Sequence, residues 1–88
     1  MGETITTRVD NEMAKDIAFF SDINKLDKST ITRRLLAKSL EEEKLAYALH
    51  RYKNGEITIG KAAELVKKDL REMLFLASKR GIHFQYSL

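Results

Sequence analysis

Hydrophobic and polar positions alternate at the start of the chain. In "TITTRV", Ile5 and Val9 fall on one side of an extended segment, while Thr4, Thr6 and Arg8 fall on the other. This alternation predicts a β-strand. No later segment alternates equally well, so the strand lacks an obvious partner within the chain. The simplest partner is the same strand of a second copy, antiparallel across a two-fold axis, which predicts an obligate homodimer.

Helical spacing then replaces the alternation, and either Asp10 or Asn11 is a suitable N-cap residue. Apolar residues recur three and four positions apart over residues 11–23 and predict a first helix. Asp27 can cap a second helix that begins near Lys28. Its apolar residues keep helical spacing as far as "KNG", where Gly55 is a stop signal, so we expect a helix of about 25 residues.

The chain after Gly55 predicts two shorter helices, over residues 59–66 and 70–79, with Gly81 ending the second. Together they resemble a helix-turn-helix, whose second helix enters a DNA groove, although the turn "VKKD" has no glycine. The basic residues that would then contact phosphates are Lys67, Lys68, Arg71, Lys79 and Arg80. Alternatively, these two helices form a module that packs within the protein or binds a partner protein. The tail "IHFQYSL" alternates weakly and predicts no definite structure.

These elements predict a mainly α fold in two parts. We expect residues 1–53 to form a dimerisation domain of one β-strand and two helices, intertwined with a second copy around a two-stranded antiparallel ribbon. Residues 54–88 would form a C-terminal extension, a helical hairpin similar to a helix-turn-helix.

The composition of the chain limits which kinds of protein it can be. At 88 residues the chain can bury only a modest core, and with 43% hydrophobic residues it is too apolar for a disordered protein. Its net charge of +3 permits nucleic-acid binding without requiring it. Cysteine is absent, which excludes disulfides and thiolate metal sites. The sequence has neither a signal peptide nor a membrane-spanning apolar run, so we expect a cytoplasmic protein without membrane contact.

The first half carries a family resemblance. The run from "TITTRVD" to "LDKSTITRRLLAKSL" resembles ribbon-helix-helix transcription regulators of the Arc, MetJ and CopG type. The matching features are the alternating strand, the acidic cap before the first helix, and "DKS" at the start of the second. The resemblance implies a dimer that places a β-ribbon in the major groove of DNA.

On such a ribbon, Thr4, Thr6 and Arg8 would contact the bases. Arginine offers a bidentate fork to guanine, and threonine can donate, accept or touch a thymine methyl group. A solvated strand face is the plainer interpretation of the same three residues.

The start of the second helix predicts phosphate contacts. Lys28, Ser29 and Thr30 lie where free N–H groups and the helix dipole favour an anion. Arg33 and Arg34 would supply secondary contacts with DNA. An ordinary first helical turn explains Ser29 and Thr30 almost as well.

The second half, including "NGEITIGKAAELVKKDL" and "RGI", is similar to the C-terminal part of an uncharacterised family of small archaeal and bacterial proteins. In some members a ribbon-helix-helix unit precedes this segment. The two halves therefore support the same interpretation.

The sequence thus predicts a homodimeric, sequence-specific DNA-binding repressor that blocks polymerase at a two-fold operator. The alternative is an antitoxin whose C-terminal helices bind a toxin, and a third is a structural oligomer without affinity for DNA. "NGEITIGK" lacks the spacing of a phosphate-binding loop, and His50 and His83 have no neighbouring metal ligands in sequence. We therefore expect no enzymatic activity, no metal and no cofactor.

Overall fold

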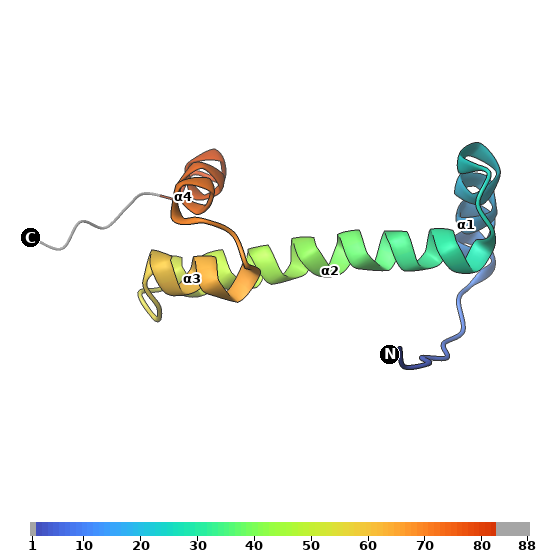
Figure 1. Ribbon diagram of the computed structural model, residues 1–88, viewed down its shortest axis with the longest axis horizontal. Coiled ribbons are helices and arrows are strands. Elements are labelled where there is room, and N and C mark those ends of the chain that lie inside the picture. The colour runs from blue at the N-terminus through green and yellow to red at the C-terminus, as the bar shows by residue number, and fades with distance from the viewer. Residues whose placement is uncertain (1, 83–88) are drawn as a thin grey trace, which may run out of the picture. The chain divides into compact units, whose positions relative to one another are not determined.

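The computed structural model describes residues 2–82, in which the chain forms four helices (Figure 1). These are α1 (Asn11–Asn24), α2 (Lys28–Lys53), α3 (Ile59–Val66) and α4 (Leu70–Lys79). The four helices predicted from apolar spacing are confirmed. None of them is both long enough and apolar enough to cross a membrane.

Contacts group the chain into an N-terminal unit, Met1–Ala37, and a C-terminal unit, Lys38–Leu88, with the boundary inside α2. This grouping concerns contacts alone. The functional division into residues 1–53 and 54–88 stays a prediction. The tail "HFQYSL" lies outside the described residues.

The β-strand predicted in "TITTRV" is wrong. Residues 2–9 have no regular secondary structure, and no strand occurs anywhere in residues 2–82. The predicted two-stranded ribbon, and the ribbon-helix-helix fold built on it, are corrected to an all-helical fold in this range; the mainly α class is confirmed. Alternation determines which side chains would share a face, but a strand exists only when its N–H and C=O groups find a partner. The described chain supplies none.

α1 is closed at both ends by local hydrogen bonds. Asp10 accepts from the backbone N–H of Met13 at 2.8 Å, which caps the first turn as the sequence predicted. At the other end Lys25 adopts the left-handed conformation, with φ of 54°. The N–H of Leu26 then donates to the carbonyl of Ser21 at 3.1 Å and turns the chain toward α2.

The N-terminal unit has a very small core. Ile31 is the one apolar side chain fully buried among its described residues, at 1% exposure. The large apolar side chains that remain exposed in this unit are Ile5, Val9, Met13, Phe19, Phe20, Ile23, Leu35 and Leu36. A segment of this size cannot be stable on one buried side chain, because the entropy lost on ordering it exceeds that gain. By itself, this unit therefore buries little apolar surface.

The C-terminal unit has a proper core, formed where the C-terminal half of α2 meets α3 and α4 (Figure 1). Its buried members are Leu45, Ala48, Leu49, Ala62, Ala63, Met73 and Ala77. Four of the seven are alanines, which allow helices to approach closely while Leu49 and Met73 fill the space between them.

Two glycines end helices in the C-terminal unit, as the sequence predicted. Gly55 after α2 has φ of 76°, and Gly81 after α4 has φ of 72°. Residues with a side chain are strained in this region, whereas glycine adopts it freely. The N–H of Glu56 donates to the carbonyl of Arg51 at 2.9 Å, and that of Ile82 to Ala77 at 3.0 Å, which satisfies the last carbonyls of both helices.

Candidate functional site

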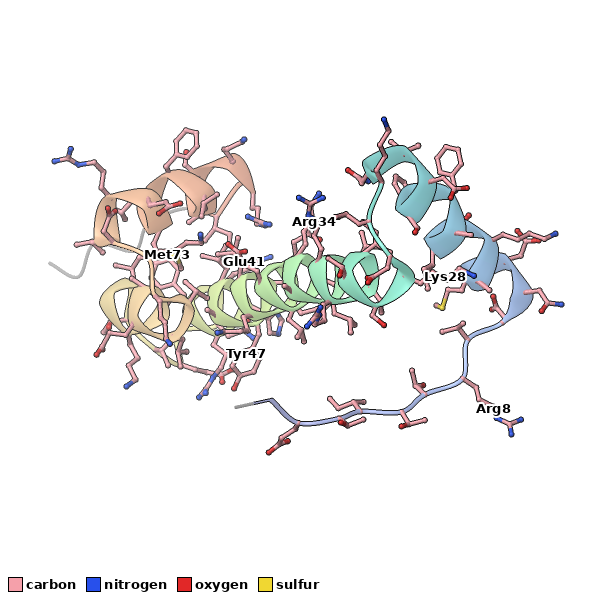
Figure 2. All side chains as sticks on the ribbon, turned by 45° about the vertical axis from the view of Figure 1, so that its right-hand side comes forward. Arg8, Lys28, Arg34, Glu41, Tyr47 and Met73 are labelled. Carbon is pink, nitrogen blue, oxygen red and sulfur yellow. The ribbon has the colours of Figure 1, made fainter. Side chains whose placement is uncertain are left out.

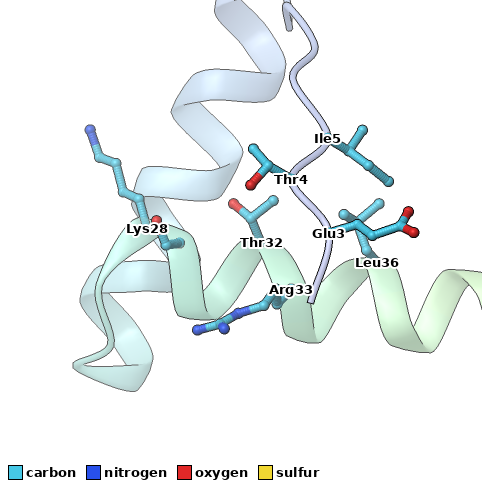
Figure 3. Close-up of a pocket in the computed structure, with 8 residues that line it drawn as sticks. Glu3, Thr4, Ile5, Lys28, Thr32, Arg33 and Leu36 are labelled. Atoms are coloured by element: carbon cyan, nitrogen blue, oxygen red, sulfur yellow. The ribbon is translucent and has the colours of Figure 1, made fainter. Parts of the chain in front are cut away.

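An open hollow lies in the N-terminal unit, between the irregular N-terminal segment and the first turns of α2 (Figure 3). Its volume is about 550 Å³. The residues that line it are Glu3, Thr4, Ile5, Lys28, Ser29, Thr32, Arg33 and Leu36. The structure therefore brings Thr4, a predicted base contact, to the same surface as the predicted phosphate contacts Lys28 and Ser29.

Arg33, predicted as a secondary contact, also lines this hollow. The exposed side chains of Lys28 and Arg33 place two positive charges at its α2 side, against one carboxylate from Glu3. Ile5 and Leu36 add apolar surface that is 85% and 54% exposed. The hollow thus combines cationic groups, hydroxyls and an uncovered apolar edge.

The other predicted contacts do not line the hollow. Thr6 and Arg8 are exposed on the N-terminal segment, and Figure 2 shows Arg8 extending away from the chain. Arg34 donates to the side-chain oxygen of Asn24 at 3.5 Å, a weak contact that leaves the guanidinium in solvent. Thr30 is half-buried.

The first turn of α2 already binds one negative charge. Asp27 accepts from the backbone N–H of Thr30 at 2.7 Å. The hydroxyl of Thr30, then its N–H, and finally the positive charge of Arg33 lower the pKa of Asp27. Asp27 is therefore ionised at neutral pH and occupies the helix N-terminus itself. The groups left for an external phosphate are the exposed side chains of Lys28 and Ser29.

A second hollow, of about 240 Å³, lies in the C-terminal unit and is lined by α2, α4 and the turn before α4. The ammonium group of Lys68 lies 3.4 Å from a carboxylate oxygen of Glu41 and 3.5 Å from one of Glu72. The hydrogen bond to Glu41, followed by the charge of Glu72, raises the pKa of Lys68. Lys68 therefore offsets one of the two negative charges beside it and links the elements that line this hollow.

Sequence reasoning missed the pairing of Lys68 with Glu41. The two residues lie 27 positions apart, so no local spacing indicates it. The sequence indicated only that α2 and α4 each have apolar residues to bury, which could bring the two helices together in one core.

Arg51 is also engaged within the C-terminal unit. Its guanidinium donates to the hydroxyl of Tyr47 at 3.1 Å and to the carboxylate of Glu56 at 3.1 Å, and these bonds raise the pKa of Arg51. The guanidinium carbon lies 5.7 Å from the centre of the Tyr47 ring. This arginine therefore stabilises the end of α2 and the turn after it.

Metal-ligating side chains do not gather in threes in the part of the chain that the structure describes. The ring nitrogen Nε2 of His50 lies 3.1 Å from the side-chain nitrogen of Asn54, one turn along α2. His83 lies outside the described residues.

Comparison with known proteins gives one relative. No protein-family model matches the chain, and no solved structure does. A UPF0175 protein of Archaeoglobus fulgidus is 41% identical over 59 residues, which cover 66% of this chain and 68% of that protein. The chain belongs to the UPF0175 family. Membership of UPF0175 confirms the coarser part of the predicted resemblance, to a family of small uncharacterised proteins; no ribbon-helix-helix family is shown.

Proposed function

We propose that this chain is a sequence-specific DNA-binding regulator of transcription, which represses a promoter by occupying it as a dimer. The observation that carries the proposal is the meeting of Thr4 with Lys28, Ser29 and Arg33 around one hollow. Hydroxyl groups and cationic side chains are the usual protein contacts to bases and phosphates.

The corrected fold changes how the N-terminal segment would contact DNA. An irregular arm that carries an arginine can enter a DNA groove without forming a strand, as the arms of homeodomains do. Thr4, Thr6 and Arg8 are all exposed along such a segment. We assign base contacts to these three residues and phosphate contacts to the start of α2.

The exposed apolar residues of the N-terminal unit support a homodimer. Phe20 and Ile23 of α1 are 42% and 59% exposed, and Leu35 and Leu36 of α2 are 38% and 54% exposed. Large apolar side chains left uncovered at this density mark an interface. We assign this surface to a second copy of the chain, because two-fold homodimers are by far the commonest soluble oligomers.

The phosphate contact at α2 is tested by the salt dependence of DNA binding. Each phosphate contact that is removed lowers the slope of log K against log salt by about 1. We expect Lys28→Ala to lower the slope by about 1 for each subunit of the dimer, about 2 in all, on specific and random duplexes alike. Lys15→Ala, which removes an exposed lysine from α1, is the matched control. Equal slopes for both variants and the wild type would remove Lys28 from the interface.

The second candidate function is an antitoxin that binds a toxin through α3 and α4. It is favoured by the exposed apolar side chains of Leu65, Leu70 and Phe75, which are 37%, 48% and 61% exposed. A stable complex with the protein encoded next to this gene, resistant to salt and lost in Phe75→Ala, would establish it.

A further inference from the structure

The positive charge of the chain is concentrated in one segment. Residues 1–56 contain ten basic and ten acidic residues, whereas residues 57–82 contain six basic and three acidic ones. The whole excess of +3 therefore lies in the segment that forms α3, α4 and the turns beside them. A local basic excess of this kind is compatible with a nucleic-acid surface, and the positions of its cations decide whether it can serve as one.

Two of the three acidic residues of this segment are engaged internally, and the third, Glu64, is exposed on α3. Asp69 accepts from the backbone N–H of Glu72 at 2.7 Å and so caps α4. Glu72 pairs with Lys68 at 3.5 Å. Lys68 also pairs with Glu41. The other five basic residues of the segment are exposed. These are Lys61, Lys67, Arg71, Lys79 and Arg80.

The turn between α3 and α4 has the length typical of a helix-turn-helix. It contains three residues, Lys67 to Asp69, and Lys67 adopts the left-handed conformation with φ of 56°. The N–H of Lys68 donates to the carbonyl of Ala63 at 3.0 Å and closes α3. Lys67 thus takes the conformation that glycine usually supplies in such turns.

Three helices support this turn. The C-terminal half of α2 packs with α3 and α4 around one core, as in the three-helix variant of the helix-turn-helix. α3 begins at Thr58, whose hydroxyl accepts from the N–H of Lys61 at 3.0 Å. Both helices of the motif therefore have a fixed start, and α4 is held by Met73 and Ala77, each 0% exposed.

The outer face of α4 combines cations with an aromatic ring. Arg71, Phe75, Ser78 and Lys79 are exposed at spacings of three, four and seven or eight residues, which place them on one side of the helix. Phe75 is 61% exposed, and the ammonium group of Lys79 lies 5.4 Å from the centre of its ring. Such a face could contact DNA, because the cations can pair with phosphates and the ring can pack against a thymine methyl group in the major groove.

We propose that α4 is a recognition helix that enters the major groove of double-stranded DNA. Arg71 and Lys79 contact guanine edges or phosphates, and the ring of Phe75 packs against a thymine methyl group. The inference rests on the proposed DNA-binding function and adds to it a second contact surface, independent of the N-terminal arm.

The test uses the full chain and two labelled duplexes, one from upstream of its own gene and one with the same bases scrambled. Fluorescence anisotropy gives affinities at several salt concentrations. The double variant Arg71→Ala, Lys79→Ala is compared with Lys44→Ala, Lys53→Ala, which removes equal charge from exposed positions of α2. Circular dichroism verifies the helix content of both.

We expect the α4 double variant to lower the slope of log K against log salt by about 2 for each subunit that contacts DNA, and the α2 double variant to leave it nearly unchanged. If the wild type binds DNA and the two double variants share its slope, α4 does not contact DNA and the inference fails, while the proposed function stands. If the wild type binds neither duplex at any salt concentration, the proposed function fails and this inference fails with it.

The variant Phe75→Ala distinguishes contact with bases from the electrostatic contribution to DNA binding, because it removes the ring and leaves the charge of α4 unchanged. We expect it to weaken binding to the upstream duplex more than to the scrambled one and to leave the salt slope unchanged. The side chain is 61% exposed, so the fold tolerates its removal. If the variant keeps the wild-type preference for the upstream duplex, Phe75 does not contact a base. If instead the wild type forms a salt-resistant complex with another protein and Phe75→Ala loses it, α4 binds a protein partner and not DNA.

Discussion

Lys68, in the turn before α4, donates to Glu41 of α2 at 3.4 Å, although the two residues lie 27 positions apart in the chain. The same ammonium group lies 3.5 Å from Glu72 of α4. Lys68 therefore links α2 to α4 beside the shared core. Its side chain is 18% exposed, but those of Glu41 and Glu72 are 66% and 49% exposed, so solvent screens much of the pairing.

This link predicts a pH dependence of stability. Because the pKa of Lys68 is raised by Glu41 and Glu72, the folded state binds its proton more tightly than the unfolded state. The stabilisation is complete below the ordinary lysine pKa of 10.5 and is lost as pH rises through the higher folded value. Thermal unfolding of the wild type should therefore weaken more at alkaline pH than that of Lys68→Gln. Parallel losses in both proteins would contradict the pairing.

Substitution by glycine should stabilise the protein at Lys67 and destabilise it at Lys44. The φ of 56° at Lys67 is unfavourable for a residue with a side chain, so Lys67→Gly should raise the free energy of unfolding by about 1 kcal/mol. Lys44→Gly, inside α2, should lower it by about 1 kcal/mol. Urea unfolding measures both. A destabilised Lys67→Gly would mean that the left-handed turn is not present in solution.

The core of the C-terminal unit is tested by a matched pair of leucines in α2. Leu49 is 1% exposed and Leu40 is 61% exposed. We expect Leu49→Ala to lower the free energy of unfolding by about 2–4 kcal/mol, because it leaves a cavity among the alanines. Leu40→Ala should change it by less than about 0.5 kcal/mol, provided that no partner covers it. Similar values for the two variants would contradict the packing of α2 against α3 and α4.

The proposed homodimer is tested at Leu36. Sedimentation should show a dimer of the wild type at low micromolar concentration. Leu36→Glu should shift it to the monomer, because a carboxylate would be buried without a partner. Lys44→Glu introduces the same residue at an exposed polar position of α2 and should leave the dimer intact. A folded wild-type monomer would exclude the apolar residues of the N-terminal unit as a dimer interface.

The helices could be predicted because their signals are local. Asp10 caps α1, and Gly55 and Gly81 end α2 and α4, as their residue types indicate. The apolar spacing within each helix needed no information from the rest of the chain. Lys25 and Lys67 were different, because lysine has no preference for the left-handed conformation that both adopt.

The strand was predicted wrongly because its evidence was incomplete. Alternation in "TITTRV" describes side chains, whereas a strand depends on backbone partners elsewhere. The DNA contacts of the candidate site stay a prediction: Thr4, Lys28 and Ser29 line one hollow and Arg8 does not, which shows where these residues lie but not what they bind. Contacts between distant segments, such as that of Lys68 with Glu41, follow from packing and leave no pattern in the local sequence.

The central claim is that the protein binds a particular DNA sequence, and the most direct measurement is the anisotropy of the duplex upstream of its own gene against a scrambled duplex. We predict tight, salt-dependent binding with a clear preference for the upstream duplex, and a reduced preference in the folded variant Thr4→Ala, Thr6→Ala, Arg8→Ala. Equal affinity of the wild type for both duplexes, or no binding to either, would contradict the account.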